Sequence, residues 1–216
     1  MKKITFFLLL FPFIVFSQDD LLGELNEEIK EDRKVISVFK SLKVVNFETT
    51  KLANKKDFYL VISHRFGSVK NGIYDLFGLD QAVTQFKFIY GVNEWLNIGA
   101  ARSSNQKKYG IHAKYRLKYQ EKNGFPISIV GYNLITANTS LKENAYPNIS
   151  FEDRLSYTSQ LLISRKINEN LSILFAPSFI HENLATRSFV QENGTTVFYD
   201  EENNQFALGF GGRYKV

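Results

Sequence analysis

Apolar and polar residues alternate with a period of two along most of the chain after residue 35. Residues 109–119 show this most clearly: tyrosines and aliphatic residues occupy the odd positions, while His112, Lys114 and Arg116 are among the even ones. Successive side chains of a β-strand point to opposite faces, so this pattern predicts a strand with one apolar and one cationic face. The chain is therefore predicted to be built from two-sided strands.

Nine segments carry this alternation, and most have about nine to eleven residues, the length that a tilted strand needs to cross the hydrocarbon layer. They are residues 35–45, 58–66, 82–90, 96–102, 109–119, 127–137, 155–163, 171–181 and 206–215, of which the first is the weakest. Tight Asn/Gly-type turns at residues 93–94, 122–124 and 168–170 alternate with longer loops, and Asn193-Gly194 predicts an extra hairpin inside the last of these. Short turns at one end and long loops at the other are typical of outer-membrane barrels.

We therefore predict an all-β protein, an antiparallel up-and-down transmembrane β-barrel of eight to twelve strands when complete. Nine strands do not fit the even number found in single-chain bacterial barrels. Either residues 35–45 form a periplasmic or lumenal segment, which leaves eight strands, or the natural chain continues. We expect the second, a barrel domain that lacks its last strands.

The polarity of the two strand faces distinguishes a membrane barrel from a soluble one. Charged side chains facing lipid would each cost about 2–4 kcal/mol near the midplane, so the cationic row must face the lumen. The lumenal candidates, which could bind or pass a small anionic solute, are Arg65, Lys87, His112, Lys114 and Arg116. One alternative is a lumen plugged by paired charges, for instance by the acidic segment near the N-terminus. Another is a soluble periplasmic carrier with an apolar interior for a lipid-like ligand.

The first residues predict export. Residues 1–17 combine Lys2 and Lys3 with a run of thirteen mostly apolar residues and then Ser17, the composition of a secretory signal peptide. Residues 18–34 form an acidic N-terminal segment, expected to be a short amphipathic helix, and residues 35–216 form the barrel domain. Removal of the first 17 residues leaves 25 basic and 22 acidic residues, so the basic pI is no argument for binding nucleic acid.

Two blocks of sequence resemble a known family. Residues 62–67, Ile-Ser-His-Arg-Phe-Gly, and residues 76–82, Leu-Phe-Gly-Leu-Asp-Gln-Ala, are similar to an uncharacterised outer-membrane β-barrel family of Bacteroidota, as are Phe39-Lys40-Ser41 and the Gly-Gly-Arg-Tyr-Lys block at 211–215. The resemblance covers residues 35–216 and implies a barrel with no assigned activity. It also implies further strands after residue 215.

The loop at residues 67–81 carries the most distinctive local chemistry. We expect Arg65 to point into the lumen and to pair with Asp75 or Asp80, so that the loop folds over the mouth of the barrel. His64 and Gln81 are further candidates for pinning this loop. The pairing could shape a ligand site or only hold the loop in place.

Enzymatic chemistry finds little support. The chain has no cysteine, which excludes disulfides, thiolate metal sites and cysteine nucleophiles. Its three histidines lack metal-ligand spacing, so we expect no metal and no cofactor. Ser63 and His64 point to opposite faces of one strand, so we also expect no enzymatic activity. The alternative is an outer-membrane acyl-transfer or hydrolase enzyme. The expected protein is a structural or solute-handling barrel of the outer membrane, whose partners are membrane lipid and a small anion rather than nucleic acid.

Overall fold

The computed structural model describes residues 38–45, 47–142, 148–184, 188–192, 195–199 and 202–215. The chain divides into two compact units, residues 1–33 and residues 34–216, and every described residue belongs to the second. The predicted signal peptide at 1–17 and the acidic segment at 18–34 lie outside the described residues, so both stay predictions.

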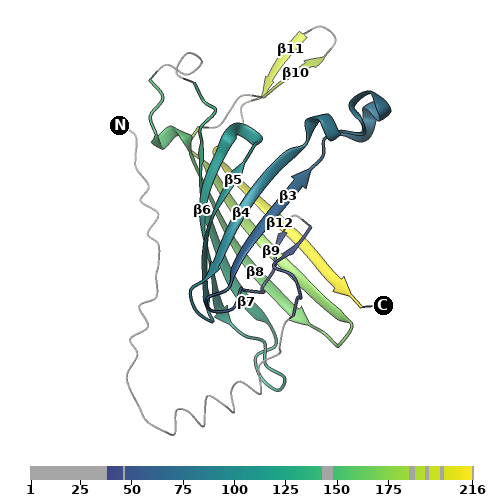
Figure 1. Ribbon diagram of the computed structural model, residues 1–216, viewed down its shortest axis with the longest axis vertical. Helices are drawn as coiled ribbons and strands as arrows, with labels where there is room; N and C mark the ends of the chain where they lie inside the picture. Colours follow the sequence, from purple (N-terminus) through teal and green to yellow (C-terminus); the bar gives the residue numbers. More distant parts are fainter. Residues whose placement is uncertain are drawn as a thin grey trace. The chain divides into compact units, whose positions relative to one another are not determined.

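Eight long strands form one antiparallel sheet that curls into a half-barrel (Figure 1). They follow one another along the chain as β3 (Phe58–Arg65), β4 (Val83–Gly91), β5 (Leu96–Ser103), β6 (Lys108–Lys118), β7 (Ser128–Asn138), β8 (Leu155–Lys166), β9 (Leu171–Glu182) and β12 (Asn204–Tyr214). Each strand pairs with the next in an up-and-down order, as predicted for the eight strong segments. Among the described residues the two edge strands, β3 and β12, do not pair with each other.

Two small hairpins accompany the sheet. β10 (Ser188–Glu192) and β11 (Thr195–Tyr199) pair antiparallel, which confirms the hairpin predicted in the last loop. β1 (Lys43–Val44) pairs with β2 (Phe47–Glu48), and these two strands have only two residues each. The prediction of a wall strand at residues 35–45 is therefore wrong, and its described part agrees with the alternative of a lumenal segment.

The apolar face of the sheet points outward, as predicted. Phe88 and Phe210 are 41% and 72% exposed, whereas Lys114 on the opposite face is 3% exposed. Exposed aromatic side chains also lie near both ends of the wall, with Tyr157 and Phe206 at the long-loop end and Trp95 and Tyr214 at the short-turn end. Such aromatic girdles flank the lipid-facing band of membrane barrels.

The helices are short and lie in the connections. They are the 3-10 helices η1 (Val69–Asp75), η2 (Leu79–Gln81), η3 (Asn105–Lys107) and η4 (Glu152–Arg154). No helix in the described part of the chain is long and apolar enough to span a membrane.

Candidate functional site

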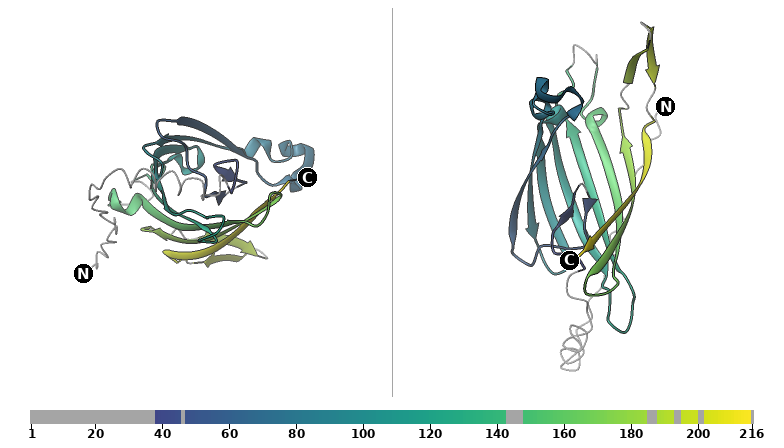
Figure 2. Two further views of the ribbon diagram at one scale, coloured as in Figure 1. Left: turned by 90° about the horizontal axis from the view of Figure 1, so that it is seen from below. Right: turned by 90° about the vertical axis from the view of Figure 1, so that its right-hand side faces the viewer.

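Residues 38–45 and 47–53, which together we call the plug, lie inside the curve of the sheet (Figure 2). The inner faces of the wall differ from one side to the other. The side chains of Val38, Phe39 and Leu52 are at most 6% exposed, and they belong to the same buried cluster as apolar side chains of β7, β8 and β9. These wall residues are Val130, Leu162, Leu174 and Ala176. This half of the lumen is a packed apolar core.

The other half of the lumen is charged and contains the predicted cations. Glu48 of β2 accepts a hydrogen bond from Lys87 Nζ of β4 at 2.6 Å and another from Lys114 Nζ of β6 at 3.3 Å. Lys43 Nζ lies 3.8 Å from the same carboxylate. Glu48, Lys87 and Lys114 are 3–5% exposed, so this ion cluster is shielded from water. Buried charges require partners of this kind, because taking an unpaired charge out of water is costly.

Two aromatic rings complete the cluster. Lys87 Nζ also donates to the hydroxyl of Tyr132 at 3.2 Å and lies 4.8 Å from the centroid of that ring. The His112 ring packs on Tyr132 with centroids 5.7 Å apart. A Cβ atom at Gly99 of β5 would clash with the backbone oxygen of Phe88 and with the His112 ring, so only glycine fits here beside the imidazole. His112 Nδ1 is buried, and no group among the described residues forms a hydrogen bond with it.

The lysines also fix the charge state of the plug. Burial by itself would raise the pKa of the Glu48 carboxyl, but the Lys114 and Lys87 ammonium groups outweigh it and lower that pKa to about 2. The carboxyl is therefore ionised at neutral pH. Glu48 supplies one negative charge among three lysines.

Further contacts hold the plug at its C-terminal end. Arg116 donates to the carbonyl oxygen of Thr50 at 3.1 Å, and the Thr50 hydroxyl bonds that of Ser164 on β8. The Asn97 amide, oriented to satisfy both of its polar atoms, accepts from Ala53 N at 2.7 Å. The plug is thus bonded to β5, β6 and β8 in addition to the ion cluster.

A cavity of about 300 Å³ lies on the long-loop side of the ion cluster. Lys43, Glu48, Lys87 and Tyr132 line it together with residues from the long-loop ends of the strands, including Arg65 of β3 and Lys108 of β6. Amide and hydroxyl side chains complete the lining, among them Gln85, Gln160, Thr136 and Thr158. Four cations and one carboxylate line this cavity, and Glu182 lies 3.7 Å from the lining Lys108, so an excess of positive charge remains.

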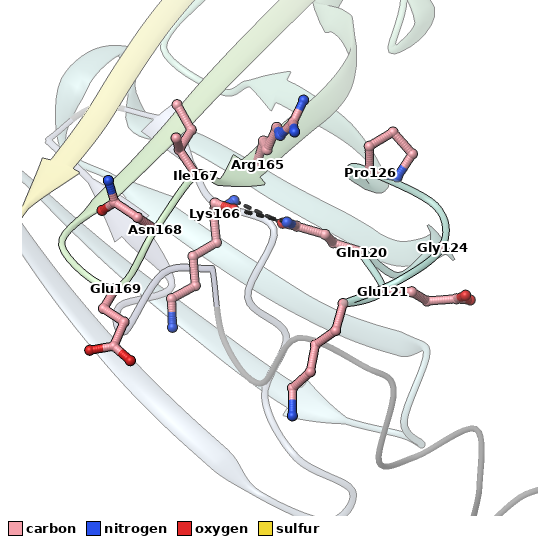
Figure 3. A pocket seen from close by; sticks show the side chains of 10 residues that line it. Gln120, Glu121, Gly124, Pro126, Arg165, Lys166, Ile167, Asn168 and Glu169 are labelled. Atoms are coloured by element: carbon pink, nitrogen blue, oxygen red, sulfur yellow. Dashed lines mark hydrogen bonds between the residues drawn. The ribbon is translucent and has the colours of Figure 1, made fainter.

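A second hollow, of about 550 Å³, lies among the short turns (Figure 3). The Gln120 side chain there donates to the carbonyl oxygen of Lys166 at 2.9 Å and accepts from Lys166 N at 2.8 Å. This pair of bonds ties the β6–β7 connection to the end of β8. Lys122, Arg165 and Lys166 share the hollow with Glu121 and Glu169, and this mixture of charges favours no one class of ligand.

The structure brings most of the predicted lumenal residues together. Lys87 and Lys114 meet at Glu48, and His112 packs on Tyr132 beside them. Arg65 lines the cavity, and Arg116 bonds the plug backbone. Sequence reasoning missed Glu48 and the part of the plug that carries it. The excess of inward cations was the available clue, because such a row requires a counter-charge.

The loop at residues 67–81 is built differently from the prediction. Asp75 is buried and accepts from Asn71 Nδ2 and Gly78 N at 3.2 and 3.1 Å, and no ion pair joins Arg65 to Asp75 or Asp80 in the described chain. Asp75 therefore pins the loop from within.

Two of the other pinning candidates also have placements. His64 Nδ1 is 3.1 Å from Thr84 Oγ1 and so links β3 to β4. Asp80 and Gln81 are exposed. The Gln81 side chain covers Gly67 so closely that a Cβ atom there would lie 2.7 Å from Gln81 Oε1.

The serine and histidine pairs are also separated. Ser178 and His181, a serine and a histidine three residues apart on β9, bond to different partners: the Ser178 hydroxyl to Gln160 and the His181 ring to Asn204. Within the described residues, no group of three His, Cys, Asp or Glu side chains could hold a metal ion.

Comparison with known proteins identifies a family for this chain. A family described as Membrane bound beta barrel domain (DUF5777) matches residues 39–216. No curated protein and no solved structure matched the chain. The family description and the outward apolar face together contradict the alternative of a soluble carrier.

Proposed function

Because the chain belongs to this family of membrane-bound β-barrel domains of unknown function, we propose that it is an exported outer-membrane barrel that binds a small anionic solute in its lumen. The observation that supports this proposal is the cavity of about 300 Å³, whose lining has four cations and one carboxylate: Lys43, Arg65, Lys87 and Lys108 with Glu48. Partly enclosed cavities lined by one sign of charge concentrate ions of the other sign. The neutral amides and hydroxyls of the lining suit an anion that also carries hydroxyl groups.

The expected orientation places the cavity toward the outside of the cell. Long loops of outer-membrane barrels face outward and short turns face the periplasm. The cavity lies at the long-loop end, and the plug fills the lumen on its other side. We therefore expect a solute to enter the cavity from outside, and we expect the plug to obstruct its passage into the periplasm.

Anion binding is tested with the full-length protein in detergent, by calorimetric titration with succinate, gluconate and inorganic phosphate. Arg65→Gln and Lys108→Gln should each weaken binding about tenfold, the effect of losing one hydrogen bond to a charged group. Lys118→Gln is the matched control, since Lys118 is an exposed cation of β6 outside the cavity and lies over the Phe125 ring. Equal binding by all three variants would reject the cavity as the site.

Passage is tested separately in planar bilayers. The wild-type protein should show low conductance, and Glu48→Gln should raise it, because this change removes the partner that both buried lysines bond. Anion preference should then fall in Arg65→Gln. If the wild-type protein conducts freely, the plug does not close the lumen.

We propose a non-enzymatic role, which the separation of Ser63 from His64 supports. Ser63 is half-buried and His64 is exposed, on opposite faces of β3. Ester hydrolysis that disappears in His64→Ala while the fold is retained would overturn this proposal. Heat-modifiable migration and co-fractionation with the outer membrane test the location.

A further inference from the structure

The loop at residues 67–81 presents an unusual amount of apolar surface. Six large side chains in it are at least 45% exposed, and Tyr74 and Ile73 reach 92% and 80%. The six are Val69, Ile73, Tyr74, Leu76, Phe77 and Leu79. Contiguous exposed apolar surface of this kind marks an interaction site.

The loop is rigidly built around a polar centre. Its two ends meet where Gly67 N donates to Gly78 O at 2.8 Å, and Phe77 N donates to Gly72 O at 2.7 Å. The buried Asp75 carboxylate accepts from Gly78 N. The Asp75 carboxylate and these backbone groups therefore face inward, while the six apolar side chains point out beside the exposed Lys70, Asp80 and Gln81.

The backbone of the loop is also strained at the residues that carry this surface. Leu76 and Phe77 have φ angles of 49° and 58°, in the left-handed region that bulky residues rarely adopt. Both side chains are more than half exposed, so packing within the protein does not explain this conformation. Strain that is maintained by the surrounding hydrogen bonds is common at binding surfaces.

The position of the loop identifies lipid as the occupant. The outer face of β3, which leads into the loop through Phe66, is part of the apolar surface of a membrane-bound barrel: Phe58, Leu60 and Ile62 are 50–64% exposed. Figure 1 shows η1 and the following turn beyond the end of β3, and Figure 2 shows them displaced to the side rather than over the space that holds the plug. The apolar loop thus extends the lipid-facing surface at the end of the wall.

We propose that residues 67–81 insert into the bilayer interface and anchor the long-loop rim of the barrel to lipid. The mixture of aliphatic and aromatic side chains with an exposed lysine, Lys70, suits the boundary between headgroups and acyl chains. This anchor is independent of any solute in the lumen. A second copy of the chain and a protein partner are the competing occupants.

Site-directed fluorescence tests the anchor in the full-length protein. Trp95, the one tryptophan of the chain, is replaced by Trp95→Phe, and Tyr74→Trp then places a single indole on the loop. Phe151→Trp in the same background is the matched control, because Phe151 is 68% exposed and lies in the β7–β8 connection. Each protein is placed in phosphatidylethanolamine–phosphatidylglycerol vesicles that contain 5-doxyl phosphatidylcholine, and fluorescence is quenched separately with iodide.

If the proposal holds, doxyl lipid should quench the indole at position 74 at least about twice as strongly as the one at position 151. Iodide should quench the indole at position 151 more strongly. Both results are expected if the loop inserts by about 5–10 Å. Full iodide quenching at position 74 with little doxyl quenching would overturn the proposal. Protection from both quenchers would also overturn it and would indicate a protein partner, or a second copy if the protection depends on protein concentration. Ile73→Trp repeats the test if Tyr74→Trp does not show heat-modifiable migration.

Discussion

Replacing Glu48 with glutamine tests whether the ion cluster holds the plug in the lumen. The carboxylate accepts from Lys87 and Lys114 at 2.6 and 3.3 Å, and both ammonium groups are buried. Glutamine keeps the size of the side chain but removes its charge. Glu48→Gln therefore leaves two cations in the lumen without the counter-charge that both now contact.

Two independent lines of reasoning give the size of the effect. Removing one member of a buried ion pair costs about 3–5 kcal/mol, because the remaining charge is left without compensation. The lowering of the Glu48 pKa from 4.5 to about 2 corresponds to about 3 kcal/mol of preferential stabilisation of the ionised form. The two figures agree, so we expect a loss of about 3 kcal/mol or more in the free energy of unfolding.

The measurement is urea-induced unfolding in detergent micelles or lipid vesicles, followed by far-UV circular dichroism and by tryptophan fluorescence. Glu182→Gln is the control, because Glu182 and Lys108 lie 3.7 Å apart with both side chains 28% exposed. A partly exposed pair of this kind contributes about 0–1 kcal/mol. Limited proteolysis of residues 38–53 reports separately on release of the plug.

A second variant separates loss of the ion pair from general damage. Adding Lys87→Met and Lys114→Leu to Glu48→Gln removes the two buried charges that have lost their partner, and replacing buried ionic groups by apolar ones is often neutral. Most of the lost stability should return. The reasoning is refuted if Glu48→Gln lies within about 1 kcal/mol of the wild type, or if the triple variant is no more stable than the single one.

Three further results are expected. Gly209→Val should loosen the plug and raise its protease sensitivity, since a Cβ atom there would lie 2.5 Å from the Phe47 ring; Gly212→Val, where the nearest contact is an ordinary 3.4 Å, should change little. Asp75→Ala should unfold the loop at 67–81 at a cost of about 1–3 kcal/mol, because the donors that bond Asp75 lose their acceptor. Amide hydrogen exchange should then become faster in the loop and stay unchanged in the strands. Folding lowers the Glu48 pKa, so the contribution of Glu48 to the free energy of unfolding should persist from neutral pH to about 4.5 and be lost as pH falls toward 2. Unfolding measured across this pH range should show no such loss in Glu48→Gln.

The wall of the protein was predictable because alternation records which face of each strand meets lipid. In β6, for example, Ile111 points outward and Lys114 points inward. Shifting the strand register by one residue would place charged side chains in lipid. The pairing of neighbours then follows from the short and long connections. The eight long strands were therefore found from the sequence within a few residues of their observed ends.

The plug was not predictable in the same way. Its strands have two residues each, too few to show a period, and its contacts with the wall are specific to the folded lumen. The sequence did indicate a row of inward cations that needs a counter-charge, but the acidic segment at 18–34 contains more carboxylates than the region around Glu48. The counter-charge of the lumenal lysines is thus the Glu48 carboxylate, whose position depends on the three-dimensional path of the chain.

The plug precedes the wall along the chain, yet its contacts are with residues that come much later. Glu48 is 39 residues from Lys87 and 66 from Lys114, and Thr50 is 114 residues from Ser164. Contacts across such separations form late in folding, because the intervening chain must first be brought together. We therefore expect the plug, which is synthesised before the wall, to dock last. On this order, Lys87 and Lys114 would have to stay solvated by water during membrane insertion until Glu48 and the rest of the plug displace that water.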